Sequence, residues 1–180
     1  MCGGIERRRI FRDNQDRQDF VDRLSRVLKE TSTTCLAWCL MDNHFHLLLK
    51  TGHCPIAGVM RRVLTGYAVT FNRRHKRSGH LFQNRYKSIL CQEEPYLLEL
   101  VRYIHLNPLR GGIVGLLEKL DRFEFCGHGV LMGNRKNDWQ DVDTVLSRFG
   151  AKVHAGRRGY RHFLMEGIAA GKRDDLIGGG

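Results

Sequence analysis

The sequence predicts an α+β fold in which helices cover one face of an antiparallel sheet. Three observations lead to this prediction: apolar residues at helical spacing in three stretches, two apolar segments on either side of a turn, and one further apolar segment of strand length. Their order is helix, hairpin, helix, strand, helix, which suits a sheet packed against helices. The chain's 180 residues and 42% hydrophobic content are enough for one core.

The first helix and a β-hairpin are expected near the start of the chain. An amphipathic helix is predicted over 15–30, where apolar residues recur every three to four positions among Asp, Arg and Lys. The segments 35–40 and 44–50 are apolar, and an Asp-Asn pair between them favours a turn. Because side chains alternate along a strand, His44 and His46 should lie on the same face, close enough to share an ion.

Three more elements are expected after the hairpin. A second helix should span 56–71, because four apolar residues recur there at every fourth position. A basic turn over 72–79 and a strand over 81–90 should follow. A third helix should run over 93–107, because acids and a proline suit its start and Pro108 should end it.

Tyr103 and Asn107 lie four residues apart in the last turns of this third helix. They should therefore share one face, about 6 Å apart at Cβ. The amide oxygen of Asn107 could complete a metal site with the two hairpin imidazoles, and the phenol would then lie beside the metal. Each signal alone has a simpler alternative: alternating strand histidines are more often surface residues, and a tyrosine before Asn-Pro is more often a core residue at a helix end.

Positive charge is concentrated around an acid-free tract, residues 43–92, which contains no Asp or Glu although the chain's 19 acidic residues in 180 would place about five there. The whole chain has a formal net charge of +11. A face without carboxylates can approach phosphates, so we predict nucleic-acid binding, with a solvated basic face as the alternative. The candidate DNA-binding residues are Arg61, Arg62, Arg73, Arg74, Lys76, Arg77, Arg85 and Lys87.

Composition also bears on the compartment. No apolar run approaches the roughly 18 to 20 residues that cross a bilayer, and the first residues lack the apolar core of a signal peptide, so we expect a cytoplasmic protein without a membrane partner. The six cysteines form no Cys-x-x-Cys pair, which indicates free thiols. A zinc site that joins Cys35 or Cys39 to His44 and His46 is the alternative, although its spacing matches no common zinc pattern.

The character of the chain changes beyond Asp121. We expect a catalytic domain over 1–120 and a small helical C-terminal appendage over 121–180, with short helices at 142–149 and 159–168. Basic residues in the appendage could add DNA contacts or form a solvated helix face. They are Arg157, Arg158, Arg161 and His162.

Four motifs occur in order along the chain: LMDNHFHLL at 40–48, FNRRH at 71–75, GHLFQNRYKS at 79–88 and YIHLNPLR at 103–110. In order and spacing they resemble the successive motifs of the REP-associated tyrosine transposases, a group within the single-tyrosine HUH transposases of short insertion sequences. The resemblance implies a ferredoxin-like antiparallel sheet with the nucleophile helix near the HUH strand.

By position, the resemblance implies that His44 and His46 are paired metal ligands, that Asn107 is the third ligand and that Tyr103 is the nucleophile. It also implies a divalent ion, Mg²⁺ or Mn²⁺, and cleavage of single-stranded DNA beside REP-like hairpins by a monomer or homodimer. The products would be a 5′-phosphotyrosine and a free 3′-hydroxyl. The alternative is a catalytically inactive or domesticated DNA-binding remnant, because the family's first, central strand precedes the stretch matched by 4–11 and should be missing here.

Overall fold

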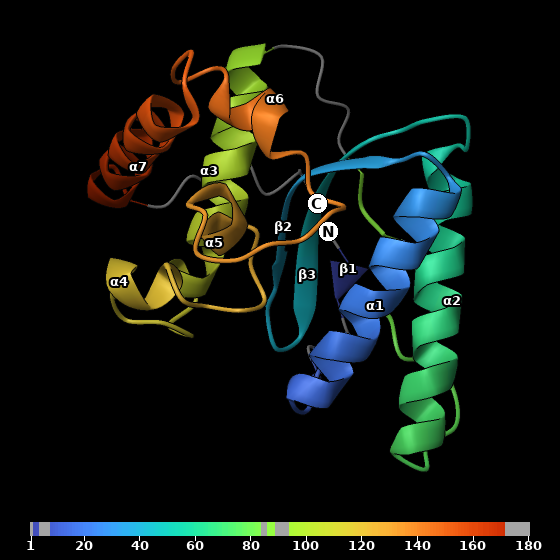
Figure 1. Ribbon diagram of the computed structural model, residues 1–180. Helices are drawn as coiled ribbons and strands as arrows, with labels where there is room; N and C mark the ends of the chain where they lie inside the picture. Colours follow the sequence, from blue (N-terminus) through green and yellow to red (C-terminus); the bar gives the residue numbers. More distant parts are fainter. Residues whose placement is uncertain (1, 4–7, 84–85, 89–93, 172–180) are drawn as a thin grey trace.

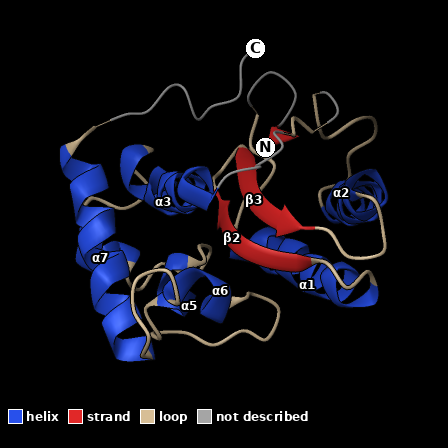
Figure 2. Ribbon diagram, turned by 90° about the horizontal axis from the view of Figure 1, so that it is seen from above, coloured by secondary structure: helices blue, strands red, loops and turns tan. Residues whose placement is uncertain are grey.

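A three-stranded antiparallel sheet lies between two groups of helices in the computed structural model of the chain (Figure 1). The strands occur in the order β1 (Cys2–Gly3), β3 (His44–Lys50), β2 (Thr34–Leu40), so the strand with the two candidate histidines is central. Figure 2 shows the sheet from above, with helices on either side of it. The residues that the structure describes are 2–3, 8–83, 86–88 and 94–171.

The predicted hairpin is confirmed as β2 and β3. Cys39 pairs with His46 and Leu40 pairs with Phe45, and the register shifts at an irregularity between Cys35 and Ala37. On its other side β3 pairs with the two residues of β1, so a short strand is present where the sequence predicts none.

Two long helices, α1 (Asn14–Glu30) and α2 (Ile56–Arg74), cover one face of the sheet. Both predicted helices are confirmed, and α2 continues past its expected end at residue 71. The start of α1 is set by Asp13, whose side chain accepts a hydrogen bond from the backbone N–H of Asp16 at 3.0 Å. The two helices and β3 enclose a core rich in aromatic side chains: Phe11, Phe20, Phe45, Tyr67 and Phe71.

The second face carries α3 (Glu94–Arg110) and the C-terminal segment (Figure 1). Four helices follow α3: α4 (Leu117–Leu120), α5 (His128–Leu131), α6 (Val142–Leu146) and α7 (Val153–Ala169). The helix predicted from 159 thus begins six residues earlier, at Val153. Leu131 and Leu164 are buried in one core with Val101 of α3 and Ala37 of β2, so the segment expected to be an appendage packs directly on the sheet.

Helices cover both faces of the sheet, whereas the sequence predicts helices on one face only. The α+β class and the antiparallel sheet are confirmed. The difference comes from β2: Trp38 and Leu40 pack with α1 and α2, while Ala37 and Cys39 pack with α3 and α7. A strand that is buried on both sides gives an unbroken apolar run, as 35–40 does, but periodicity alone does not distinguish such a run from a buried helix segment.

The strand predicted over 81–90 is wrong for the part that the structure describes. Residues 81–83 and 86–88 contain a single bridge residue, Phe82, and otherwise bends or irregular backbone. Leu81 is nevertheless buried against the aromatic core, so the apolar pattern there reflects packing rather than a strand.

The predicted end of α3 is also wrong, because the helix passes through Pro108 and ends at Arg110. Pro108 lies in the last turn of the helix, and beyond it the N–H of Gly111 still donates to the carbonyl of Asn107 at 2.7 Å. Gly112 then adopts a positive φ of 71°, a conformation that suits glycine after a helix. Neither α3 nor any other helix within the described ranges is long and apolar enough to cross a membrane.

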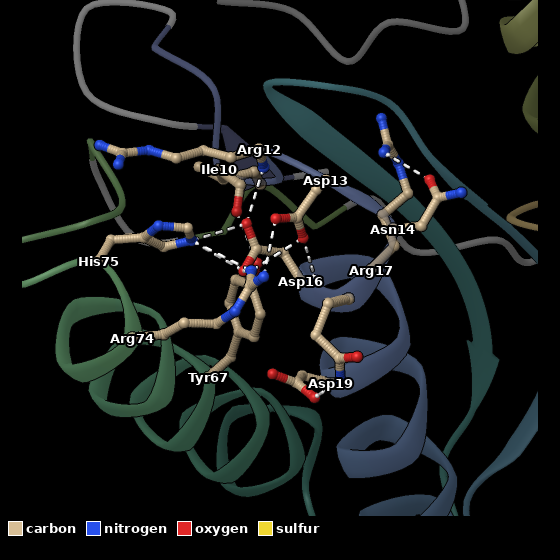
Figure 3. A network of polar contacts seen from close by, with 11 residues as sticks. Ile10, Arg12, Asp13, Asn14, Asp16, Arg17, Asp19, Tyr67, Arg74 and His75 are labelled. Carbon is tan, nitrogen blue, oxygen red and sulfur yellow. Dashed lines mark hydrogen bonds and ion pairs between the residues drawn. The ribbon is translucent and has the colours of Figure 1, made fainter.

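A polar network joins the start of α1 to the end of α2 (Figure 3). Arg74 lies 2.8 Å from a carboxylate oxygen of Asp13 and also forms an ion pair with Asp16, which is 1% exposed. The imidazole of His75 lies 2.9 Å from the same Asp16 carboxylate, and the backbone N–H of Arg12 donates to it at 2.8 Å. Arg74 is therefore a structural partner of α1 within the fold.

We expect Arg74→Ala to lower the free energy of unfolding, because Asp16 stays buried with one cation fewer. The hydrogen bond from Arg74 also lowers the pKa of Asp13 from 3.8 to about 2. The stability that ionised Asp13 adds to the fold is fully present above about pH 4. It is lost as the pH falls towards 2, because the Asp13 carboxyl takes up a proton in the unfolded chain before it does so in the folded protein. Urea unfolding between pH 2 and 7 should therefore show the wild-type advantage shrinking below pH 4. Arg73→Ala, at the exposed neighbouring residue, is the control, and equal stability of the two variants at pH 7 would contradict the prediction.

Candidate active site

The two histidines of the hairpin lie side by side on β3, as their spacing predicts. The centroids of the His44 and His46 rings are 5.0 Å apart, and the ring planes are nearly perpendicular at 85°. Phe45 between them points into the aromatic core with α1 and α2. The imidazoles therefore face the opposite side of the sheet, where α3 lies.

Helix α3 brings Tyr103 against this histidine pair. The ring centroids of Tyr103 and His46 are 5.5 Å apart, with the planes at 88°. Asn107 lies one turn further along α3, and its amide nitrogen donates to the carbonyl oxygen of Tyr103 at 2.8 Å. Because that hydrogen bond uses the nitrogen, the side-chain oxygen of Asn107 is the atom that could accept another partner.

Both imidazoles are suited to be neutral donors of a lone pair. Burial lowers the pKa of His46 well below its usual value, and the neighbouring His44 lowers it further. Nε2 of His46 is buried and has no hydrogen-bond partner among the described residues. Burial also lowers the pKa of His44, and its Nδ1 lies 2.7 Å from the amide oxygen of Asn43. An amide oxygen only accepts, so this contact assigns the proton of neutral His44 to Nδ1 and leaves the lone pair on Nε2.

A divalent cation held by the two imidazoles and the Asn107 amide fits these residues better than a zinc site that includes a cysteine thiolate. Imidazole nitrogens and an amide oxygen are ordinary ligands of divalent metals, and the buried Nε2 of His46 has no hydrogen-bond partner among the described residues. Burial raises the pKa of Cys35 and of Cys39, which keeps both thiols protonated. Within the described ranges no group of three or more His, Cys, Asp or Glu side chains could hold a metal ion, so nothing there supports the zinc alternative.

The described cysteines are free thiols, as the sequence predicts. They are Cys35, Cys39, Cys54 and Cys126.

The basic residues of the acid-free tract fall into two groups. Arg61, Arg73 and Lys76 are exposed on α2 and the turn that follows it. Arg62 instead forms an ion pair with Glu30 of α1, as Arg74 does with acids of the same helix. The sequence could not separate these groups, because the acids that pair with the second group lie on α1, outside the tract.

Three further candidates have other surroundings. The guanidinium of Arg77 donates to the side chain of Asn72 at 3.1 Å and lies 5.8 Å from the centroid of the Phe71 ring. Lys87 is exposed. Arg85 lies outside the described residues.

Sequence reasoning missed two features near the candidate site. Asn43 was expected only as a turn residue, although its position next to His44 is a signal that it could orient a ligand. The other feature is a buried polar chain that ends on His105 of α3 and involves Tyr160 of α7. No sequence period could indicate it, since its members come from separate elements.

Comparisons with known proteins show the family and the fold of the chain. The family model described as "Transposase IS200 like" matches residues 2–107, which is more than half of the chain. A solved structure, "Structure of the REP associates tyrosine transposase bound to a REP hairpin", is similar with a TM-score of 0.58 and 15% sequence identity, over 78% of this chain and 90% of that chain. No curated protein matches the sequence.

The fold and the family match define a transposase that acts on DNA. The chain belongs to the IS200-like transposase family. The resemblance inferred from the four motifs is thereby confirmed at the level of the family, and the solved structure shows that the fold is shared with a REP-associated member.

Proposed function

We propose that this chain is a divalent-metal-dependent transposase that nicks and rejoins single-stranded DNA with Tyr103 as its nucleophile. The observation that carries the proposal is the contact between the Tyr103 ring and His46, whose buried Nε2 has no hydrogen-bond partner among the described residues. Membership of the IS200-like family supports the transposase class, and the motif resemblance supports the tyrosine chemistry.

His44, His46 and Asn107 would hold the cation, Mg²⁺ or Mn²⁺. When bound, such a cation neutralises negative charge that develops on the scissile phosphate. Two neutral imidazoles and a neutral amide leave most of its charge available to the phosphate, unlike a set of carboxylates. This choice of ligands suits catalysis at a phosphodiester.

Tyr103 would attack the scissile phosphorus through its phenolic oxygen. A new bond forms between that oxygen and the 5′-phosphate while the bond from phosphorus to the 3′ oxygen breaks, and the 3′ oxygen takes up a proton as the phenol loses one. The products are a 5′-phosphotyrosine and a 3′-hydroxyl. Because the tyrosyl ester retains the energy of the broken bond, a 3′-hydroxyl can reverse the step and join strands without ATP.

The substrate that we propose is single-stranded DNA that carries a hairpin. The similar solved structure is described as bound to a REP hairpin. On this chain, Arg61, Arg73 and Lys76 form an exposed basic surface on α2 and the following turn, which we call the α2 basic face. Phosphates would be held there by charge, without sequence selection. The acid-paired Arg62 and Arg74 would contribute less net charge to this face.

Tyr103→Phe should abolish the covalent adduct while hairpin DNA binding stays within about twofold, because only the attacking oxygen is removed. The assay incubates the protein with hairpin-flanked single-stranded DNA and Mg²⁺ and resolves the adduct on a denaturing gel. Tyr67→Phe, which removes a buried phenol oxygen in the aromatic core, should still form the adduct. Persistence of the adduct in the Tyr103 variant would refute the proposed nucleophile. Wild-type protein that binds hairpin DNA without forming any adduct would favour the inactive DNA-binding remnant.

His46→Ala should weaken Mn²⁺ binding by at least about tenfold, since loss of even an outer partner of a ligand has an effect of that size. Electron paramagnetic resonance titration of free Mn²⁺ measures this directly. His53→Ala, at an exposed histidine just beyond β3, should leave the affinity unchanged. Equal Mn²⁺ affinity of the two variants would remove His46 from the metal site.

The double variant Arg61→Ala, Arg73→Ala should flatten the salt dependence of single-stranded DNA binding. Each lost phosphate contact lowers the slope of log K against log salt by about 0.7, so the pair should lower it by about 1.4. A charge-matched control, Lys152→Ala with Arg158→Ala, removes two exposed cations at the start of α7. If only the control changes the slope, DNA lies on α7 and not on the α2 basic face.

A further inference from the structure

A buried chain of polar side chains joins the C-terminal helices to α3. The carboxylate of Asp121 lies 2.7 Å from Nε2 of His128, and Nδ1 of the same imidazole lies 3.0 Å from the hydroxyl of Tyr160. That hydroxyl also lies 2.9 Å from Nδ1 of His105 on α3. His105, His128 and Tyr160 are each 0% exposed. At the outer end, Arg161 donates to the Asp121 carboxylate at 2.9 Å and 3.0 Å.

The hydrogen bonds in this chain have one direction. The carboxylate of Asp121 accepts, so Nε2 of His128 carries the proton. Nδ1 of a neutral His128 must then accept, and the Tyr160 hydroxyl donates to it. The oxygen of Tyr160 is left to accept from Nδ1 of His105. Nε2 of His105, at the end of the chain, is buried without a hydrogen-bond partner in the described part of the protein.

A polar chain of this kind specifies one arrangement of the helices that it joins. The hydrophobic effect is non-directional, whereas a displacement here would leave buried polar groups unpaired. Helix α3 contributes His105 to these hydrogen bonds, so it must keep His105 within reach of Tyr160. The hydrogen bonds therefore restrict the rotation and the axial position of α3.

Two arginines of α3 add to this restraint from the same side. Arg102 donates to the backbone carbonyl of Phe163 at 3.1 Å, and its guanidinium lies 4.0 Å from the centroid of that ring. Arg110 donates to the carbonyl of Gly167 at 3.1 Å. A Cβ atom at Gly167 would lie 2.5 Å from the side chain of Arg102, so this side chain packs directly on the glycine. Helix α7 thus contacts α3 along much of its length.

This contact bears on the candidate active site because Tyr103 belongs to the same helix. Tyr103 and His105 are two residues apart and therefore point about 200° apart around the helix axis. One side chain faces His46 of β3 while the other faces Tyr160 of α7. A rotation of α3 by about 10° would move an atom about 8 Å from its axis by about 1.4 Å.

We propose that Tyr160 is a positioning residue for the reaction: through its hydrogen bond to His105 it holds α3 in the rotation that keeps Tyr103 against His46. This proposal rests on the proposed function for its catalytic consequence, but the placement of Tyr103 can be measured independently. Misplacement of a reacting group by about 1 Å can reduce a rate a hundredfold without weakening substrate binding.

The test compares Tyr160→Phe with Tyr67→Phe, which is a matched control. Each variant loses one buried phenol oxygen that makes hydrogen bonds; that of Tyr67 donates to the carbonyl of Ile10 at 2.6 Å, in the core on the opposite face of the sheet. The first measurement is the nuclear Overhauser effect between ring protons of Tyr103 and His46. The second is the single-turnover rate of adduct formation, with the dissociation constant for hairpin DNA determined in parallel.

We expect Tyr160→Phe to weaken the Tyr103–His46 Overhauser effect and to slow adduct formation about ten- to hundredfold, with DNA affinity within about twofold of wild type. Tyr67→Phe should retain the Overhauser effect and the rate. The proposal is overturned if Tyr160→Phe keeps the Overhauser effect and reacts as fast as Tyr67→Phe. If wild-type protein forms no adduct, the proposed function fails, yet the Overhauser comparison still decides whether Tyr160 positions Tyr103.

A measurement on the unaltered protein covers the case in which Tyr160→Phe does not fold. Long-range ¹H–¹⁵N spectra distinguish the two neutral tautomers of histidine. The hydrogen-bond direction requires a proton on Nδ1 of His105 and on Nε2 of His128. A proton on Nε2 of His105 instead would show that His105 does not donate to the Tyr160 oxygen. That result would overturn the proposal.

Discussion

The burial of β2 on both of its faces is the constraint on which the rest of the structure depends. A strand that is apolar on both sides needs a packing partner on each face of the sheet, and helices supply it here. Trp38 and Leu40 pack against α1 and α2 on one face, and Ala37 and Cys39 pack against α3 on the other. Helix α3, which covers β2, also reaches the neighbouring strand, where Tyr103 contacts His46.

The electrostatics of the protein are divided by the same layers. The acids of α1 neutralise those cations of α2 that face it, including Arg62 and Arg74. Cations on the outer side of α2 retain exposed charge, as Arg61 and Arg73 do. Helix packing thus separates the cations into those that form ion pairs within the fold and those that remain available to a polyanion.

The candidate site is polar on one side of α3, and α3 is held by polar contacts on its other side as well. The His46 imidazole is buried, and burial keeps it neutral. Across the helix, the imidazole of His105 is buried and bonded to Tyr160. The buried hydrogen bond between His105 and Tyr160 is directional, so it restricts the rotation of α3 from that side. The C-terminal segment shares a buried core with the sheet and α3, and it supplies Tyr160, which by our proposal positions Tyr103.

The sequence by itself determined the elements with strong local signals and which candidate site residues lie together on one strand or one helix. Alternation placed His44 and His46 on one face, and helical spacing placed Tyr103 and Asn107 together, because strand and helix geometry depend only on neighbours along the chain. Only the tertiary structure decided that helices cover both faces, that residues 81–83 and 86–88 are not a strand, and that α3 continues through Pro108. It also decided which arginines are paired with acids and that Tyr160 reaches His105. These outcomes depend on contacts between residues far apart in the chain, whose free energies exceed the local propensities and leave no periodic signal in the sequence.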